Sequence, residues 1–212
     1  MQTTPPTENF SGAAVVFDFD GTLRRGDSVG DFLRWRLLRN PLRAAPALFV
    51  LPLLWWWLRG PIADRGRAAS ALLWLATVGL SAAGFERCIA RFARQHSQGW
   101  LEPAAAALDQ HLEQDGRVIV ATAAFAPLAR ALLDLRWPQL SMVGSSLRRF
   151  AGGWVAAHHL HGSRKVQALI GIQAHPPFAH AYSDSRDDLP LVKNAAQATR
   201  VHPITGVMQP WR

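Results

Sequence analysis

The chain has 212 residues, with a hydrophobic fraction of 49% and a charged fraction of 18%. These values allow the packed core of one α/β domain with a modest insertion, and they exclude global disorder. The formal net charge of +8 is almost entirely arginine, since Lys165 and Lys193 are the only lysines. Such a chain attracts anionic phosphates or anionic lipid. Because it has no zinc-ligand spacing, basic recognition helix or RNA-binding aromatic motif, we expect no nucleic-acid partner.

The polar N-terminus, MQTTPPTENFSG, has no apolar segment typical of a secretory signal, and we expect residues 1–12 to be loosely ordered. Cys88 is the single cysteine, so no disulfide forms within the chain and a reducing compartment is expected. We interpret Cys88 as a small apolar residue of a helix rather than a nucleophile.

Strand and helix patterns can be followed along the chain. Residues 13–19 form an apolar run rich in β-branched and aromatic residues, typical of a buried parallel strand, and Asp-Gly-Thr follows as a turn. Helical patterns cover 28–43, with Ser28 as a plausible N-cap, and later 86–98 and 102–114. The rest of the chain predicts strands at 118–121, 140–143, 178–182 and 199–202, helices at 127–135, 165–170 and 189–198, and a hairpin over 146–158 with Gly152 and Gly153 as its turn.

This alternation predicts an α/β fold, a Rossmann-like doubly wound parallel sheet with an α-helical cap inserted after the first strand. The catalytic core would comprise residues 13–27 and 113–212, and the cap residues 28–112. Two uncharged apolar stretches, 44–58 and 68–85, lie within the expected cap.

The two apolar stretches allow two interpretations. The first is an ordinary helical cap with a buried core. The second is membrane association, because Trp55, Trp56 and Trp57 are consecutive and one buried face cannot hide all three rings. Between residues 24 and 67, nine arginines and three aspartates give +6, which suits an anionic membrane surface. Since 44–58 is short and contains two prolines, a shallow hairpin or interfacial helix fits better than a span, and we expect contact with anionic membrane through 34–85.

Four polar sites, which hold six candidate residues, follow predicted strands or begin a helix, where open α/β sheets bind ligands. Asp18 and Asp20 alternate on the first strand, so their side chains start on the same face. Two carboxylates held close need a cation or a proton between them, and Mg²⁺ prefers oxygen ligands. Thr122 offers a hydroxyl and Lys165 a positive charge for a phosphate, and Asp184 and Asp188 add further carboxylates. This set predicts phosphoryl-transfer chemistry.

These motifs resemble the haloacid dehalogenase superfamily, specifically its phosphoserine-phosphatase-like branch. The resemblance covers nearly the whole chain in order: DFDGT at 18–22, VIVATA with Thr122, Lys165 after Gly162, and YSDSRDDLP at 182–190. It implies that Asp18 is the nucleophile, and that Asp20 is the general acid and then the base. By the same resemblance, Asp18, the backbone carbonyl of Asp20, and Asp184 hold Mg²⁺, with Asp188 in support, while Thr122 and Lys165 bind phosphate.

One departure is that Ala123 and Ala124 follow Thr122, where residues able to bond phosphate are common, so backbone N–H groups must serve instead. A second resemblance is carried by FLRWRLLRNPLRAAPALFVLPLL, LLW, AGGW at 151–154 and YSDS, which are similar to the bacterial phosphatidylglycerophosphatase C family. It implies hydrolysis of phosphatidylglycerol phosphate at the cytoplasmic face of the inner membrane.

His158, His159 and His161 lie close together in sequence and allow three interpretations. They could bind zinc, although no acidic or cysteine ligand is near them in sequence. A surface hairpin edge or a contact with the substrate phosphate is the alternative.

The sequence therefore predicts a Mg²⁺-dependent phosphatase with a phosphate-ester substrate, best matched by a phospholipid headgroup. Two other functions remain open. The first is a soluble phosphatase of a small metabolite such as phosphoserine. The second is a non-catalytic, membrane-bound interaction protein, which the complete acidic set disfavours.

Overall fold

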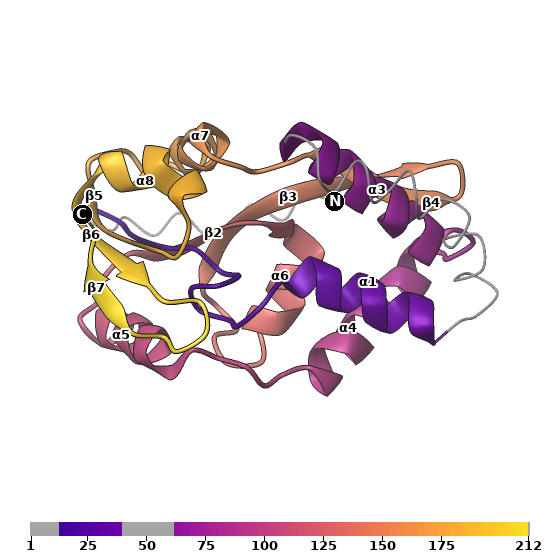
Figure 1. The fold of residues 1–212 in the computed structure, drawn as a ribbon, viewed down its shortest axis with the longest axis horizontal. Coiled ribbons are helices and arrows are strands. Elements are labelled where there is room, and N and C mark those ends of the chain that lie inside the picture. Colours follow the sequence, from indigo (N-terminus) through magenta and orange to yellow (C-terminus); the bar gives the residue numbers. More distant parts are fainter. Residues whose placement is uncertain (1–12, 40–61, 212) are drawn as a thin grey trace.

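The computed structural model describes residues 13–39 and 62–211 of the chain (Figure 1). The expectations for residues 1–12 and 44–58, including Trp55, Trp56 and Trp57, lie outside the described residues.

A seven-stranded sheet runs through the molecule in the order β4-β3-β2-β1-β5-β6-β7. Its five central strands are parallel: β3 (Ser141–Phe150), β2 (Val118–Phe125), β1 (Val15–Phe17), β5 (Phe178–Ser183) and β6 (Ala195–Val201). Two strands pair antiparallel at the edges: β4 (Gly153–His158) and β7 (Met208–Pro210). The predicted α/β fold with a mostly parallel sheet is confirmed.

Helices cover both faces of the sheet, because side chains of alternate strand residues point to opposite sides. Phe17 packs into a large cluster with the buried residues of α1 (Ser28–Leu38), α4 (Ala82–Gln95), α5 (Glu102–Glu113) and α6 (Ala126–Leu133). Val16 packs on the other face with Leu169 of α7 (Ser163–Gly171) and Leu191 of α8 (Leu189–Lys193). Figure 1 shows α7 and α8 on one side of the sheet and α5 on the other.

The helices between β1 and β2 form two groups that pack against different parts of the molecule. Helices α1, α3 (Ile62–Thr77) and α4 lie together at the far end of the hairpin formed by β3 and β4 (Figure 1). Helix α5 instead lies beside the sheet, where His111 Nε2 is 3.0 Å from the Tyr182 hydroxyl of β5. The division into a core and a cap at 28–112 stays a prediction, and α5 is the part of that range that packs on the sheet.

The apolar stretch 68–85 forms the end of α3, a turn and the start of α4, and much of it faces the protein interior. Ala68, Leu73, Ala76 and Phe85 are buried. Side-chain hydroxyls of α3 also complete the outer edge of β4: the backbone N–H of Trp154 donates to Thr77 Oγ1 (3.0 Å), and that of Ala156 donates to Ser70 Oγ (3.0 Å). An edge strand is thereby covered by a helix.

Four element predictions need correction. The helix expected at 189–198 ends at Lys193, and Ala195–Val201 is instead strand β6, paired with β5; this pairing overrides the helical preference of its alanines. Helix α1 is capped by Asp27, whose carboxylate accepts from two backbone N–H groups, and it ends at Leu38.

The hairpin turn is shifted by one residue from the prediction. Its central residues are Ala151 and Gly152, which both have positive φ angles, 43° and 79°. Gly153 begins β4, where an added Cβ would lie 2.6 Å from a ring carbon of Trp74. The second glycine therefore serves close packing against α3 rather than the turn.

Candidate active site

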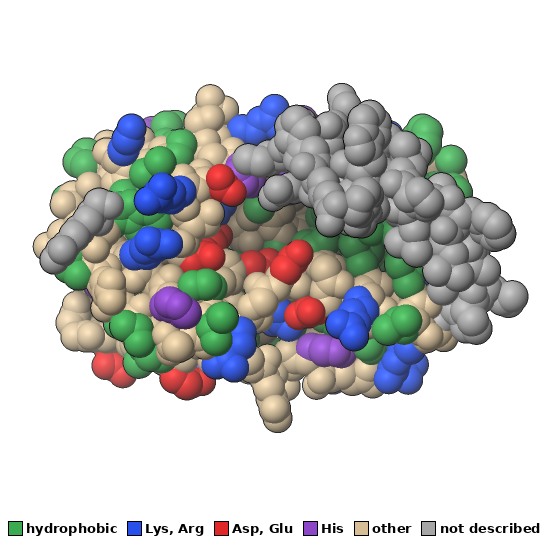
Figure 2. All heavy atoms as spheres, viewed as in Figure 1, with side chains coloured by type: hydrophobic (Ala, Val, Ile, Leu, Met, Phe, Trp, Pro, Cys, Tyr) green, Lys and Arg blue, Asp and Glu red, His purple; other side chains and the backbone are tan. Residues whose placement is uncertain are grey.

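A cavity of about 390 Å³ opens at the carboxyl ends of β1, β2 and β5. Figure 2 shows a hollow on this face of the molecule, with acidic side chains gathered around it. The cavity is lined by all six site residues predicted from the sequence: Asp18, Asp20, Thr122, Lys165, Asp184 and Asp188. The structure thus brings together residues from both ends of the chain, as expected for this edge of an open α/β sheet.

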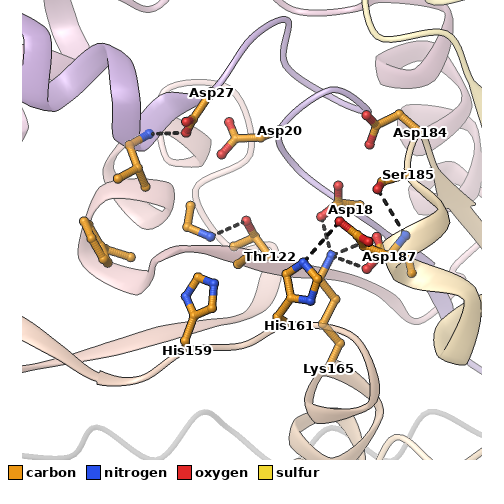
Figure 3. A pocket seen from close by; sticks show the side chains of 15 residues that line it. Asp18, Asp20, Asp27, Thr122, His159, His161, Lys165, Asp184, Ser185 and Asp187 are labelled. Atoms are coloured by element: carbon orange, nitrogen blue, oxygen red, sulfur yellow. Dashed lines mark hydrogen bonds and ion pairs between the residues drawn. The ribbon is translucent and has the colours of Figure 1, made fainter. Parts of the chain in front are cut away.

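Lys165 lies at the centre of a buried hydrogen-bonded cluster (Figure 3). Its Nζ donates to Asp18 Oδ1 at 2.7 Å, and it lies 2.8 and 2.9 Å from the two carboxylate oxygens of Asp188. The Ser183 hydroxyl donates to Asp188 Oδ2 at 2.8 Å. Asp188 therefore fixes the lysine, and the lysine in turn fixes the carboxylate of Asp18.

The charges of this cluster shift each other's pKa values. Burial raises the pKa of the Asp18 carboxyl to about 7, against the opposing pull of the Lys165 ammonium. Burial alone would lower the pKa of the Lys165 amine, but the two aspartates outweigh it and hold that pKa above its ordinary value. A buried ammonium bonded to two carboxylates is a permanent positive charge at the floor of the cavity.

Asp20 is held by the first residue of helix α1. Its two carboxylate oxygens accept hydrogen bonds from the backbone N–H of Ser28 (2.9 Å) and the Ser28 hydroxyl (2.8 Å). Burial raises the pKa of Asp20 to about 7, while the bonds from Ser28 oppose that shift. A carboxyl that holds its proton near neutral pH suits a general acid.

Asp184 approaches the turn that follows β1. A Cβ on Gly21, whose φ is +79°, would lie 2.5 Å from Asp184 Oδ2, so glycine is required there both for its conformation and for space. The Thr22 hydroxyl lies 3.4 Å from the other oxygen, Oδ1. Burial, followed by the nearby charge of Asp188, raises the pKa of Asp184.

The donor set fits a hard divalent cation. When ionised, Asp18, Asp184 and Asp188 carry three negative charges against the single ammonium of Lys165, an excess of two (3 − 1) that a divalent cation would neutralise. Within residues 13–39 and 62–211, no group of three His, Cys, Asp or Glu side chains is arranged to hold a metal ion. A Mg²⁺ site of two carboxylates, a backbone carbonyl and waters does not require three such side chains.

Thr122 lies in β2, directly after Ala121, where the regular pairing of β2 with β3 is interrupted. Its Oγ1 accepts from the backbone N–H of Ala124 at 3.0 Å, so its own proton is available for an oxygen in the cavity. Ala123 and Ala124 also line the cavity and leave its wall small at this point.

The sequence left open whether His158, His159 and His161 contact the substrate or form a surface hairpin edge. His159 and His161 line the cavity, whereas His158 is exposed on β4 and does not. Sequence reasoning missed two serines of the site. Ser28 was expected only as a helix cap, and Ser183 was not singled out. No local pattern marks either serine, because each acts on an aspartate brought to it by the fold.

Residues 15–193 match the family of haloacid dehalogenase-like hydrolases. Three solved structures share the fold. A protein of unknown function from Bordetella pertussis Tohama I is 19% identical over 91% of this chain and 92% of its own, with a TM-score of 0.69. A phosphoserine phosphohydrolase-like protein from Francisella tularensis subsp. tularensis SCHU S4 is 14% identical, covering 88% and 86%, with a TM-score of 0.58. A substrate-bound phosphoserine phosphatase is 14% identical, covering 90% and 86%, with a TM-score of 0.55.

The doubly wound sheet and its acidic cavity define an α/β enzyme whose site is built for phosphate esters. The chain belongs to the haloacid dehalogenase-like hydrolase family.

Proposed function

We propose that the protein hydrolyses phosphate monoesters through an aspartyl-phosphate formed on Asp18. The observation that carries this proposal is the Lys165 ammonium bonded to both Asp18 and Asp188 at the floor of a cavity that Thr122 also lines. A nucleophilic carboxylate beside a fixed positive charge and a hydroxyl donor is the arrangement that phosphoryl transfer needs.

The site residues share the steps of this mechanism. Asp18 attacks phosphorus, and the bond between phosphorus and the leaving alkoxide breaks. Asp20 gives its proton to that alkoxide and then takes a proton from the water that hydrolyses the aspartyl-phosphate. Thr122 and Lys165 hold the oxygens of the transferred group. Mg²⁺, held by Asp18, the backbone carbonyl of Asp20, and Asp184 with support from Asp188, would neutralise charge on the phosphate.

For the substrate, we propose phosphatidylglycerol phosphate, hydrolysed at the cytoplasmic face of a bacterial inner membrane. Support comes from the sequence of the insertion and from the +6 charge of residues 24–67. Among the described helices, none alone is long and apolar enough to cross a membrane, while the pair Ala68–Thr77 and Ala82–Gln95, bent by 107°, meets the length and composition together.

A soluble phosphatase of a small metabolite is the second candidate, and two observations favour it. Solved neighbours include phosphoserine phosphatases. The apolar face of α4, with Phe85, Ile89 and Phe92, is buried inside the protein rather than presented outward.

Phosphate release from a panel of lipid and soluble monoesters, with and without Mg²⁺, tests both candidates. The membrane proposal expects hydrolysis of phosphatidylglycerol phosphate in anionic vesicles and co-sedimentation of the protein with them. Replacing Trp55, Trp56 and Trp57 with serine should release the protein and spare hydrolysis of a soluble aryl phosphate. If the wild type ignores vesicles and prefers a soluble monoester, the second candidate is correct.

A further inference from the structure

The cavity extends beyond the residues that hold the phosphate. His159 lies in the connection between β4 and α7 and contributes to the wall of the cavity near Thr122 (Figure 3). Asp20 and Asp27 lie across the cavity from it in the same view. Because Asp20 protonates the leaving group in the proposed mechanism, the space between Asp20 and His159 is where we expect the leaving group of the substrate to bind.

His159 Nδ1 faces the hydroxyl of Ser145, a fully buried residue of β3. The Ser145 hydroxyl donates its single proton to the backbone carbonyl of Ala123 at 2.6 Å. Its oxygen accepts from the backbone N–H of Leu160 at 2.9 Å, and it faces His159 Nδ1 at 3.5 Å. Because the serine proton is already donated to Ala123, the oxygen offers His159 only a lone pair, which favours the tautomer with the ring proton on Nδ1.

The second ring nitrogen of His159, Nε2, has a different hydrogen-bonding environment from Nδ1. Among the described residues, no partner contacts Nε2 of His159, and the ring lines the cavity. Burial, together with the charges of His161, Arg164 and Lys165, lowers the pKa of His159, so the neutral ring is favoured. A neutral imidazole protonated at Nδ1 has a lone pair at Nε2 and accepts a hydrogen bond there.

We infer that His159 is a specificity-determining residue whose Nε2 accepts a hydrogen bond from a hydroxyl or ammonium group on the leaving alcohol of the substrate. The inference rests on the proposed phosphatase function and names the chemistry of its substrate. The other groups of the wall agree with it, since Asp27 and Asp187 line the cavity and also favour a donor over a second anion. A glycerol headgroup supplies a hydroxyl, and a phosphorylated amino acid supplies an ammonium group.

Matched substrate pairs test the inference. Glycerol 3-phosphate is compared with propyl phosphate, which lacks both hydroxyls, and phosphoserine with the phosphate ester of 3-hydroxypropanoate, which lacks the ammonium group. In at least one pair, kcat/KM should fall roughly 10- to 100-fold for the analogue without the donor, because the buried acceptor is then left unpaired. The pair that discriminates identifies the source of the donor. Equal kcat/KM within both pairs would overturn the inference.

Two substitutions of His159 distinguish the contribution of Nδ1 from that of Nε2. His159→Asn places an amide nitrogen near the position of Nδ1 and leaves nothing at Nε2, so the discrimination between paired substrates should disappear. His159→Gln reaches the position of Nε2 and should restore part of it. The matched control is His158→Asn on the exposed neighbouring residue, which should leave the discrimination as in the wild type. If His159→Asn discriminates as the wild type does, His159 does not read the substrate.

A spectroscopic readout makes the inference independent of turnover. Nitrogen-15 NMR of histidine-labelled protein, with the His159 signals assigned by their absence from His159→Gln, should show Nδ1 protonated and Nε2 unprotonated at pH 8. The opposite tautomer would overturn the inference even in an active enzyme. Absence of hydrolysis for every monoester, phenyl phosphate included, would instead contradict the proposed function. The NMR result would then still show whether Nε2 of His159 is a hydrogen-bond acceptor in the cavity wall.

Discussion

Lys165 Nζ donates a hydrogen bond to Asp18 Oδ1 at 2.7 Å, across 147 positions of sequence. The side chains of both residues are less than a tenth exposed, and Asp188 completes the cluster from a third segment. Since Lys165 is the cation that both buried carboxylates share, its removal would leave the two of them uncompensated. In the proposed mechanism, the same contact serves both the fold and the chemistry.

The first prediction follows from that contact. Lys165→Met should lower the free energy of unfolding by about 3–5 kcal/mol at pH 8, because two buried carboxylates lose their cation. Urea unfolding in metal-free buffer measures it. Lys193 is the only other lysine and is exposed, so Lys193→Met is the matched control and should unfold like the wild type. A stable Lys165→Met protein would show that the cluster does not depend on its cation.

The second prediction concerns Asp20 and its two bonds from Ser28. Asp20→Asn should slow hydrolysis of alkyl phosphates by about 10²–10⁴-fold and that of aryl phosphates much less, because an aryl oxide leaves without a proton. Ser28→Ala removes one of the two bonds and should show the same selectivity to a smaller degree. A plot of kcat against leaving-group pKa for each variant gives the answer; equal loss on both substrate classes would contradict a general-acid task.

The third prediction concerns the edge of β4. Thr77 is buried, and its hydroxyl accepts from the backbone N–H of Trp154 at 3.0 Å. Thr77→Val keeps the shape and leaves that N–H without its acceptor, so the free energy of unfolding should fall by about 1–3 kcal/mol. The exposed Thr205→Val should change it little. Equal stability of the two variants would show that α3 does not secure this edge.

The fourth prediction is a pH dependence of stability at the α5 face of the sheet. Burial lowers the pKa of His180, and the nearby charge of His111 adds to that shift. Between the ordinary pKa of 6.5 and the lowered folded value, the unfolded chain binds the proton and the folded chain does not. The stability contribution of His180 is therefore complete above pH 6.5 and is lost as the pH falls through the folded value.

Unfolding midpoints at pH 7.5 and 5.5 measure this loss. His180→Gln retains a group near the position of Nε2 that can meet Thr199, which lies 2.8 Å from that nitrogen, but it does not titrate. The decrease between the two pH values should thus be smaller for His180→Gln than for the wild type. His175→Gln, at an exposed position, serves as control. Identical decreases for wild type and His180→Gln would contradict the prediction.

The local sequence pattern was sufficient to predict the positions of some of the site residues. The alternation of Asp18 and Asp20 around Phe19, which is fully buried, predicted that both carboxylates face the cavity, and both line it. The strand run before Asp18 and the one before Thr122 likewise placed these residues at one edge of the sheet.

Other parts depend on contacts that no short segment contains. Lys165 and Asp188 were singled out by their positions at a helix start and after a strand, but a single lysine carries little information by itself, and only the fold shows that it bonds both Asp18 and Asp188. Ser28 binds Asp20 only because helix α1 begins beside the turn after β1. Residues 195–198 have the alanine content of a helix, and pairing with β5 makes them a strand.

The central claim is that Asp18 carries the phosphoryl group during turnover. The protein is mixed with phenyl phosphate and Mg²⁺, quenched, reduced with borohydride, which converts an aspartyl-phosphate to homoserine, and digested for mass spectrometry. The account predicts homoserine at position 18, dependent on substrate and Mg²⁺, and none at Asp20, Asp184 or Asp188. Sustained phosphate release with Asp18 unmodified, or undiminished release by Asp18→Asn, would contradict it.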